Sequence, residues 1–380
     1  MRRINLRAVG LVAIAGMLAA GTAACQSTTT TTTASCGGKL GIFGAFTGGD
    51  SGLVIPSKQG AELAVSKHNA AHPDCQVTLV YGDSQGSADQ ATPFANAWAA
   101  DPSILGVIGG HFSGESAATT PIFTAAGLVM ISPSATRVDL TSAPSAFTRV
   151  VGNDGTQGRA VAAALAKQGA TKAYAVDDKS PYGAGIVDEL VKAATGSIEV
   201  KRGTVEKNQQ EFSTLVNDIK AFAPQAIFYG GYTTEAAPLV KQLREAGVTA
   251  PFIGPDGLYD PNFPKGAAGG AEGAIITCPC LPGSKVGGNF AADFKAATGV
   301  EPGSYAAEGY DAAQIFLDAF LAGKQTRKDI WDFVKAYDKE GLSKYIKFDA
   351  NGDVDPSKVV IWTYTIKGET FEPLAPVSLS

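Results

Sequence analysis

Six short polar segments each follow an apolar run in this sequence, and they hold the side chains most able to bind a small molecule. Those in the first half offer hydroxyl groups and small residues, and those in the second half offer two tyrosines and one aspartate. Hydroxyl and N–H groups suit a carboxylate, whereas aromatic rings and an acid suit an apolar body and an ammonium group. The two sets predict a site for a zwitterion. The segments are 46–48, 111–114, 132–136, 182–183, 231–232 and 255–257.

Catalytic and metal chemistry find little support in the same sequence. Three histidines are present, and none follows His111. The chain offers no clear set of nucleophile, base and acid, and two thiols without a nearby histidine are a weak metal signal. We therefore expect a binding protein that is not an enzyme and that carries no metal and no cofactor.

The elements that must position these segments form two series of alternating strands and helices. Alternation of this kind predicts parallel sheets, whose carboxyl-terminal edges bind ligands. In the second series Asp154 precedes a helix with Gln157 three residues later, which predicts a helix cap at Asp154. The first series has strands near 39–43, 77–81, 106–109 and 128–131; the second has strands near 172–176, 198–201, 226–229 and 251–254. The tail adds helices near 290–298, 304–321 and 328–337 and a strand near 359–366.

Composition and charge exclude other classes of protein. The chain has 380 residues, of which 45% are hydrophobic, so it can bury a large core. Its formal charge is −5, which argues against nucleic-acid binding because there is no basic field to neutralise phosphates.

The first 36 residues read as an export signal followed by a tether. Arg2, Arg3 and Arg7 precede an apolar run at 11–20 that is too short to span a bilayer, and small residues lead to Cys25. Residues 22–25 resemble a bacterial lipobox with Thr22 in place of the usual leucine. We therefore expect a signal peptide at 1–24, a lipidated Cys25 and a threonine-rich tether at 25–36. Cleavage near Ala24 with release of the protein is the alternative.

Four further cysteines fit an oxidising compartment. Cys36 and Cys75 each precede a predicted strand, so adjacent parallel strands would bring them together, and we expect them to pair. Cys278 and Cys280 are two residues apart, and Pro279 between them favours the bend that a local disulfide needs. A redox or metal role for this second pair is the alternative.

The pattern resembles the periplasmic-binding-protein type I fold, and most of all the branched-chain amino-acid solute-binding proteins of ABC importers. The resemblance runs from about residue 39 to residue 365. Its matching segments are 60–65 (GAELAV), 131–136 (ISPSAT), 149–154 (RVVGND), 182–183 (YG), 229–232 (YGGY), 242–247 (QLREAG), 252–257 (FIGPDG), 271–273 (AEG) and 348–353 (FDANGD).

The resemblance implies roles for individual residues. Ser134 matches a position whose backbone binds the ligand, with Ala135 beside it, and Thr136 matches a hydroxyl that contacts both charged groups of the ligand. Tyr182 and Tyr232 match aromatic residues that close on the ligand.

Three positions depart from the family pattern. Asp256 stands where the family's ammonium-binding acid is usually glutamate. Ser113 matches a ligand-binding serine if the preceding turn is one residue shorter, and Gly114 takes that position otherwise. Leu53 stands where relatives often have an aromatic residue.

The resemblance also implies the architecture and the partners. We expect two doubly wound α/β lobes joined by three crossovers, with residues 37–152 and 279–355 in lobe one and 153–278 and 356–380 in lobe two. The ligand would be a branched-chain or other small aliphatic amino acid, bound between the lobes by hinge closure; an amide, urea or an aromatic acid is the alternative. The expected protein is a monomer outside the cytoplasm that is anchored by Cys25 and docks on an ABC permease.

Overall fold

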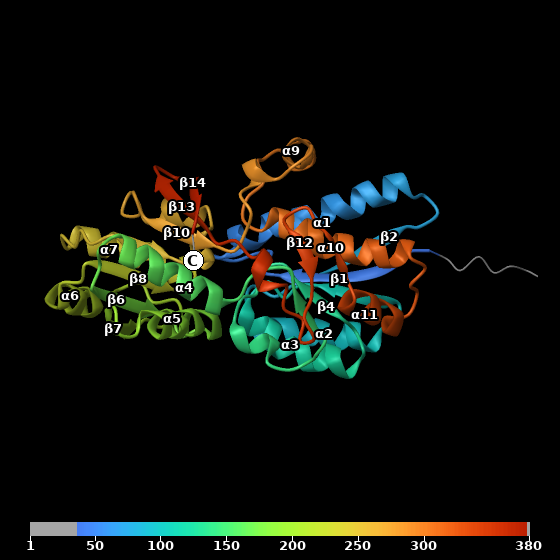
Figure 1. Cartoon of the computed structure of the whole chain (residues 1–380), viewed down its shortest axis with the longest axis horizontal. Helices are drawn as coiled ribbons and strands as arrows, with labels where there is room; N and C mark the ends of the chain where they lie inside the picture. The colour runs from blue at the N-terminus through green and yellow to red at the C-terminus, as the bar shows by residue number, and fades with distance from the viewer. Residues whose placement is uncertain (1–35, 378–380) are drawn as a thin grey trace, which may run out of the picture. The chain divides into compact units, whose positions relative to one another are not determined.

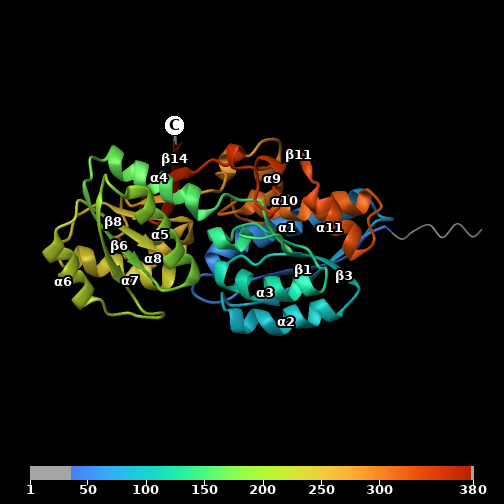
Figure 2. The ribbon, with the colours of Figure 1, turned by 60° about the horizontal axis from the view of Figure 1, so that its bottom comes forward.

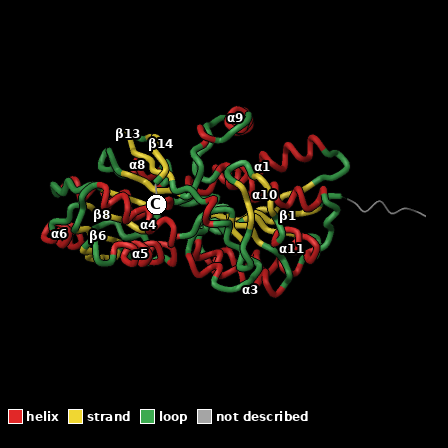
Figure 3. Tube along the Cα trace, in the orientation of Figure 1, coloured by secondary structure: helices red, strands yellow, loops and turns green. Residues whose placement is uncertain are grey.

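The computed structural model describes residues 36–377. Helices and strands alternate along this stretch, as Figure 3 shows by colour. The expected signal peptide, Cys25 and the threonine tract fall within residues 1–35 and lie outside the described residues. None of the helices in the described stretch has the length and apolar character needed to cross a membrane.

The first sheet contains five parallel strands in the order β2-β1-β3-β4-β5. Leu40 and Ile42 on β1 pack with helices on one face of this sheet, while Phe43 packs with Trp98 and Phe123 on the other. Because helices cover both faces, the central strands β1 and β3 are mostly apolar, whereas the edge strand β2 has exposed residues. The elements are β1 (Gly38–Gly44), α1 (Ser51–Ala71), β2 (Val77–Asp83), α2 (Ala88–Ala100), β3 (Ile104–Ile108), α3 (Ser113–Ala125), β4 (Met130–Ser132) and β5 (Phe147–Arg149).

The second sheet contains seven strands in the order β14-β13-β10-β9-β8-β6-β7. Strands β6 to β10 are parallel to one another, and β13 and β14 form an antiparallel hairpin beside β10. The elements are α4 (Asp154–Lys167), β6 (Lys172–Asp177), α5 (Pro181–Ala194), β7 (Glu199–Thr204), α6 (Ser213–Phe222), β8 (Ala226–Gly230), α7 (Thr233–Glu245), β9 (Phe252–Gly254), α8 (Asn262–Gly266), β10 (Ile275–Cys278), β13 (Trp362–Lys367) and β14 (Thr370–Pro376).

The last helices of the chain return to the first sheet. Helices α10 and α11 pack on the same face of that sheet as α1, and α9 packs beside them through Phe290 and Phe294. Figures 1 and 2 show these orange elements next to the blue α1, although they are distant in sequence. They are α9 (Phe290–Thr298), α10 (Ala306–Leu321) and α11 (Arg327–Lys335), followed by the small hairpin β11 (Asp338–Glu340) and β12 (Tyr345–Lys347).

The chain therefore passes between the two sheets three times: from β5 to α4, from β10 to α9, and from β12 to β13. We call the first sheet with its helices the first lobe, and the second sheet with its helices the second lobe. The predicted fold class, two parallel-sheet α/β lobes, is confirmed.

Some predicted element boundaries were wrong. Apolar residues at helical spacing predict a helix over 59–69, but helix α1 begins at Ser51, eight residues earlier. Its first turns are buried by residues that are distant in sequence, since Leu53 and Val54 belong to a core cluster that includes second-lobe residues. Asp154 is not the cap of α4. The preceding residue, Asn153, caps the helix by accepting a hydrogen bond from the N–H of Thr156 at 3.2 Å.

Two disulfides occur in the described residues. Cys36 and Cys75 are joined at the amino-terminal ends of the neighbouring strands β1 and β2. Cys278 and Cys280 are joined where the chain leaves β10, and both are fully buried. The second disulfide therefore lies at a passage between the lobes.

Candidate functional site

The loop after β4 is held against the loop after β3. Ser132 Oγ donates to the carbonyl of Gly110 (2.6 Å) and accepts from the N–H of Ala135 (2.9 Å). The hydroxyl of Ser134 donates to the carbonyl of His111 at 2.8 Å. The Ser134 hydroxyl and the Ala135 N–H are thus used within the protein, where they shape the loop.

Thr136 differs from these neighbours because its hydroxyl is free. The side chain is 1% exposed, and Oγ1 has no hydrogen-bond partner among the described residues. Ser113, the first residue of α3, lies next to the same segment, since its Oγ accepts from the N–H of Arg137 at 3.3 Å. The structure therefore brings Ser113 and the 134–136 segment together.

Arg149 fixes the segment that carries Thr136. This fully buried guanidinium donates to the carbonyls of Ala135 (3.1 Å) and Arg137 (2.8 Å), which flank Thr136, and it forms an ion pair with Asp353. Sequence reasoning did not assign this role. The sequence does offer one signal for it, a lone arginine at the end of an apolar strand. Such an arginine is expected to be buried, and a buried guanidinium needs several hydrogen-bond acceptors around it.

On the second lobe, Tyr182 and Asp256 form a hydrogen-bonded pair. The Tyr182 hydroxyl donates to Asp256 Oδ1 at 2.7 Å and accepts from the N–H of Gly257 at 3.1 Å. Burial raises the pKa of Asp256, whereas its hydrogen bonds lower it. Asp256 follows β9, and Tyr182 lies in the first turn of α5, so both lie at the carboxyl-terminal edge of the sheet.

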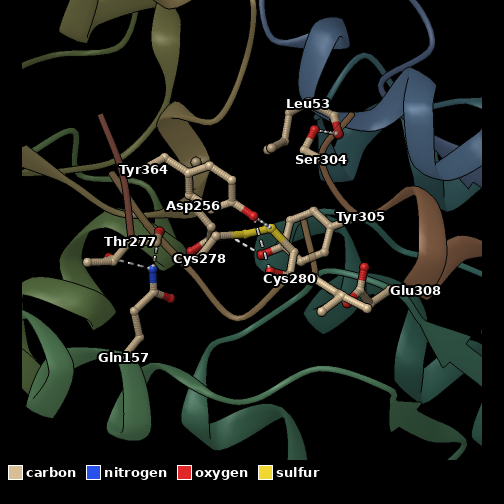
Figure 4. The surroundings of a disulfide bond; sticks show 12 residues. Leu53, Gln157, Asp256, Thr277, Cys278, Cys280, Ser304, Tyr305, Glu308 and Tyr364 are labelled. Atoms are coloured by element: carbon tan, nitrogen blue, oxygen red, sulfur yellow. Dashed lines mark hydrogen bonds between the residues drawn. A yellow bond between two sulfur atoms is a disulfide. The ribbon is translucent and has the colours of Figure 1, made fainter. Parts of the chain in front are cut away.

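Tyr305 completes this group from the first lobe, and sequence reasoning missed it. Its hydroxyl donates to Asp256 Oδ2 at 2.7 Å, so both oxygens of Asp256 accept from tyrosines. Tyr305 directly precedes α10, which packs on α1. Figure 4 shows Asp256 and Tyr305 beside the Cys278–Cys280 disulfide. The expected ammonium partner therefore already bridges the two lobes.

Other contacts also join the lobes. The ring of Tyr232 lies 4.5 Å from that of Phe112 and 5.1 Å from that of Tyr182, measured between ring centroids. Asp50 Oδ1, in the loop after β1, accepts from the N–H and the hydroxyl of Thr234 at the start of α7, both at 3.1 Å. These contacts correspond to a closed arrangement of the cleft.

A cavity of about 480 Å³ lies between the lobes. Its walls come from the loops after β1, β2 and β3 and from those after β6, β7 and β8. Tyr232 is the member of the expected set that lines it, with Phe112 and Gly114 on the facing side. Asp256 follows β9, which lies beside β8 on the side away from β6 and β7, so Asp256 lies beyond the cavity in the strand order.

The cavity has an acidic lining. Burial raises the pKa of Asp178 to about 6 and that of Glu235 to about 7, and it also raises the pKa of Asp50. Lys179 and Lys207 lie on the same wall, and Lys179 is paired with Glu206. The cavity can therefore accept hydrogen-bond donors on a ligand. Residues 36–377 contain no cluster of three or more His, Cys, Asp or Glu side chains that could hold a metal ion.

The chain is similar to known proteins over most of its length. The sequence profile of the periplasmic binding protein family matches residues 38–356. The Leu/Ile/Val-binding protein homolog 2 of Brucella abortus is 29% identical over 343 residues, which cover 87% of this chain and 91% of that protein.

Two crystal structures are similar over most of their length. A leucine-binding protein of Thermotoga maritima matches with a TM-score of 0.82 and 26% identity, covering 89% of this chain and 98% of that one. A branched-chain amino-acid transporter substrate-binding protein of Streptococcus pneumoniae, in complex with isoleucine, matches with a TM-score of 0.81 and 26% identity, covering 88% and 97%.

The fold and the cleft define a two-lobed solute receptor. The chain belongs to the periplasmic binding protein family, whose members bind solutes outside the cytoplasm and are not enzymes.

Proposed function

We propose that this protein is a lipid-anchored receptor of an ABC importer that binds a branched-chain or other small aliphatic amino acid between its lobes. The proposal rests on two sets of polar side chains, one on each lobe, at the loops that follow the strands. Thr136 offers a free buried hydroxyl on the first lobe, and Tyr182 with Asp256 offers hydroxyl and acid on the second.

The relatives support the same ligand class. The Brucella abortus relative is named for leucine, isoleucine and valine, and the Streptococcus pneumoniae structure contains isoleucine. In this proposal the carboxylate of the ligand is held by the Ser113 and Thr136 hydroxyls and by the backbone N–H of Thr136, and its ammonium lies toward Asp256. Hinge closure then places Tyr182 and Tyr232 over the ligand, and the closed monomer docks on the permease.

A second candidate ligand is an amide, urea or an aromatic acid. It is favoured by the two tyrosine hydroxyls that already occupy Asp256, because a ligand without an ammonium group would leave those hydrogen bonds intact.

A binding screen tests the proposal. The exported full chain is titrated with L-leucine, L-isoleucine, L-valine and L-alanine, and separately with urea, acetamide and benzoate. Ligand at 100 times its Kd should raise the free energy of unfolding by about 2.7 kcal/mol. We expect a clear increase in Tm with at least one amino acid. An increase confined to the second group would replace the first candidate by the second, and no increase with any compound would contradict both.

A further inference from the structure

Asp154 carries a buried carboxyl group that the fold itself does not use. The side chain has no exposed surface, and neither carboxyl oxygen has a hydrogen-bond partner among the described residues. The cap of α4 is Asn153, so capping does not explain Asp154. Burying a carboxyl group without partners is unfavourable, so the site needs a donor from elsewhere.

The free carboxyl of Asp154 lies at the candidate ligand site. Its own N–H donates to the carbonyl of Thr136 at 2.8 Å. The Thr136 hydroxyl lies close enough to the carboxyl to lower its pKa, although the pair lacks hydrogen-bond geometry. A methyl group at Gly185, in the helix of Tyr182, would lie 3.7 Å from Asp154 Oδ2. The Thr136 hydroxyl and the Asp154 carboxyl, which both lack hydrogen-bond partners among the described residues, are therefore neighbours close to α5.

The charges around Asp154 favour an incoming cation. The pKa of Asp154 is raised to about 8: burial, Asp256 and Glu189 raise it, whereas the Thr136 hydroxyl and Arg149 lower it. Arg137 is also near enough to interact. Burial raises the pKa of the Tyr182 and Tyr305 phenols well above the usual value, and the nearby Asp256 and Asp154 raise it too, so these four side chains lie near one another. The difference is that Asp256 already accepts two hydrogen bonds, whereas Asp154 accepts none.

We propose that Asp154 binds the ammonium group of the amino-acid ligand together with Asp256. The inference rests on the proposed function and adds a second acid to the site. Tyr182 and Tyr305 hold Asp256 in place, and Asp154 supplies free acceptor oxygens on the side of Thr136. An ammonium group has three N–H donors, so it can be shared between the two carboxylates.

The test compares each amino acid with its 2-hydroxy acid, which lacks the ammonium group. The full chain and Asp154→Asn are titrated calorimetrically with L-leucine and L-2-hydroxy-4-methylpentanoate, and with the corresponding valine and alanine pairs. We expect Asp154→Asn to weaken the amino acid about 30-fold or more and the hydroxy acid less than threefold. The ratio is taken within one preparation, so partial unfolding of the variant cancels.

Two further variants complete the design. Asp256→Asn should show the same selectivity. Asp74→Asn is the matched control, because it makes the same change at an exposed position that precedes β2, whereas the candidate site follows the strands. An equal loss for both compounds in Asp154→Asn, or no loss for either, would overturn the inference while leaving amino-acid binding by the wild type intact. A wild type that binds none of the three amino acids would overturn the proposed function and this inference together.

Discussion

Ser134 and Thr136 are two residues apart, yet the fold leaves only one of their hydroxyl groups free. The Ser134 hydroxyl is used to join two loops, whereas the Thr136 hydroxyl has no partner. Both positions carry the same chemical group in the sequence, so the difference depends on the loop after β3 and on Arg149. The groups that can bind a ligand are therefore the buried polar atoms that have no hydrogen-bond partner within the protein.

The buried carboxyl group of Asp154 should make the stability of the protein depend on pH. Its pKa is raised by burial to about 8 from an ordinary value of 3.8, so between those values the folded chain holds a proton that the unfolded chain releases. Stability of the ligand-free protein should therefore fall as the pH rises from 5 to 8. Asp154→Asn should reduce this slope by up to about 1.4 kcal/mol per pH unit.

Chemical denaturation at pH 5, 6, 7 and 8 measures that slope. Glu115 and Glu235 also have pKa values raised to about 7 by burial, so part of the slope should remain in Asp154→Asn. Asp74→Asn, at an exposed position, should retain the wild-type slope. A slope that is the same in Asp154→Asn and in the wild type would contradict the prediction.

Among the elements, the start of α10 connects the passages between the lobes. Glu308, in its first turn, accepts from the N–H of Leu281 at 3.0 Å, just after the second passage leaves β10. Lys344 lies 3.2 Å from Glu308 and donates to the carbonyl of Val150, just after β5, at 3.0 Å. The buried Glu308–Lys344 ion pair therefore connects the first and second passages to α10. Tyr305, which contacts Asp256, lies one helical turn before Glu308.

The Cys36–Cys75 disulfide should stabilise the folded chain. It joins the starts of β1 and β2 and closes a segment with a sequence separation of 39. Replacing both cysteines with serine should lower the free energy of unfolding by about 3–4 kcal/mol, because the unfolded chain gains conformational freedom. Denaturant titration of the variant and of the oxidised wild type measures the difference.

Ligand affinity is the control for that experiment. The disulfide lies at the amino-terminal ends of the strands, while the candidate site lies at their carboxyl-terminal ends. The variant should therefore bind the ligand within about threefold of the wild type. An unchanged unfolding free energy would show that this disulfide adds no stability.

The sequence predicted most strands and helices because their apolar periodicity is strong. It also predicted that Ser113, Thr136, Tyr182 and Asp256 would follow strands. It could not predict Tyr305, because the approach of Tyr305 to Asp256 depends on the return of α10 to the first lobe. Nor could it predict the state of Asp154, because its neighbour Asn153 is an equally good cap, and only packing decides between them.

The proposed lipid anchor would hold the receptor at a membrane surface. Cys25→Ser should move the exported protein from the membrane fraction to the soluble fraction, because the lipid that would attach to the thiol is lost. Fractionation followed by immunoblotting measures this, and the mass of the amino-terminal peptide serves as the control for cleavage. A wild-type protein that is already soluble would contradict lipidation and favour release after cleavage near Ala24.

The three passages between the sheets have a consequence for how the protein is made. The first lobe lacks α10 and α11 until residue 335 has been synthesised, and the second sheet lacks β13 until residue 367. Neither lobe can complete its core while the carboxyl-terminal part of the chain is still missing. Residues 38–149, which supply all five strands of the first sheet, must therefore wait for residues 306–335 before one face of that sheet is covered, and the second sheet must wait for residues 362–367.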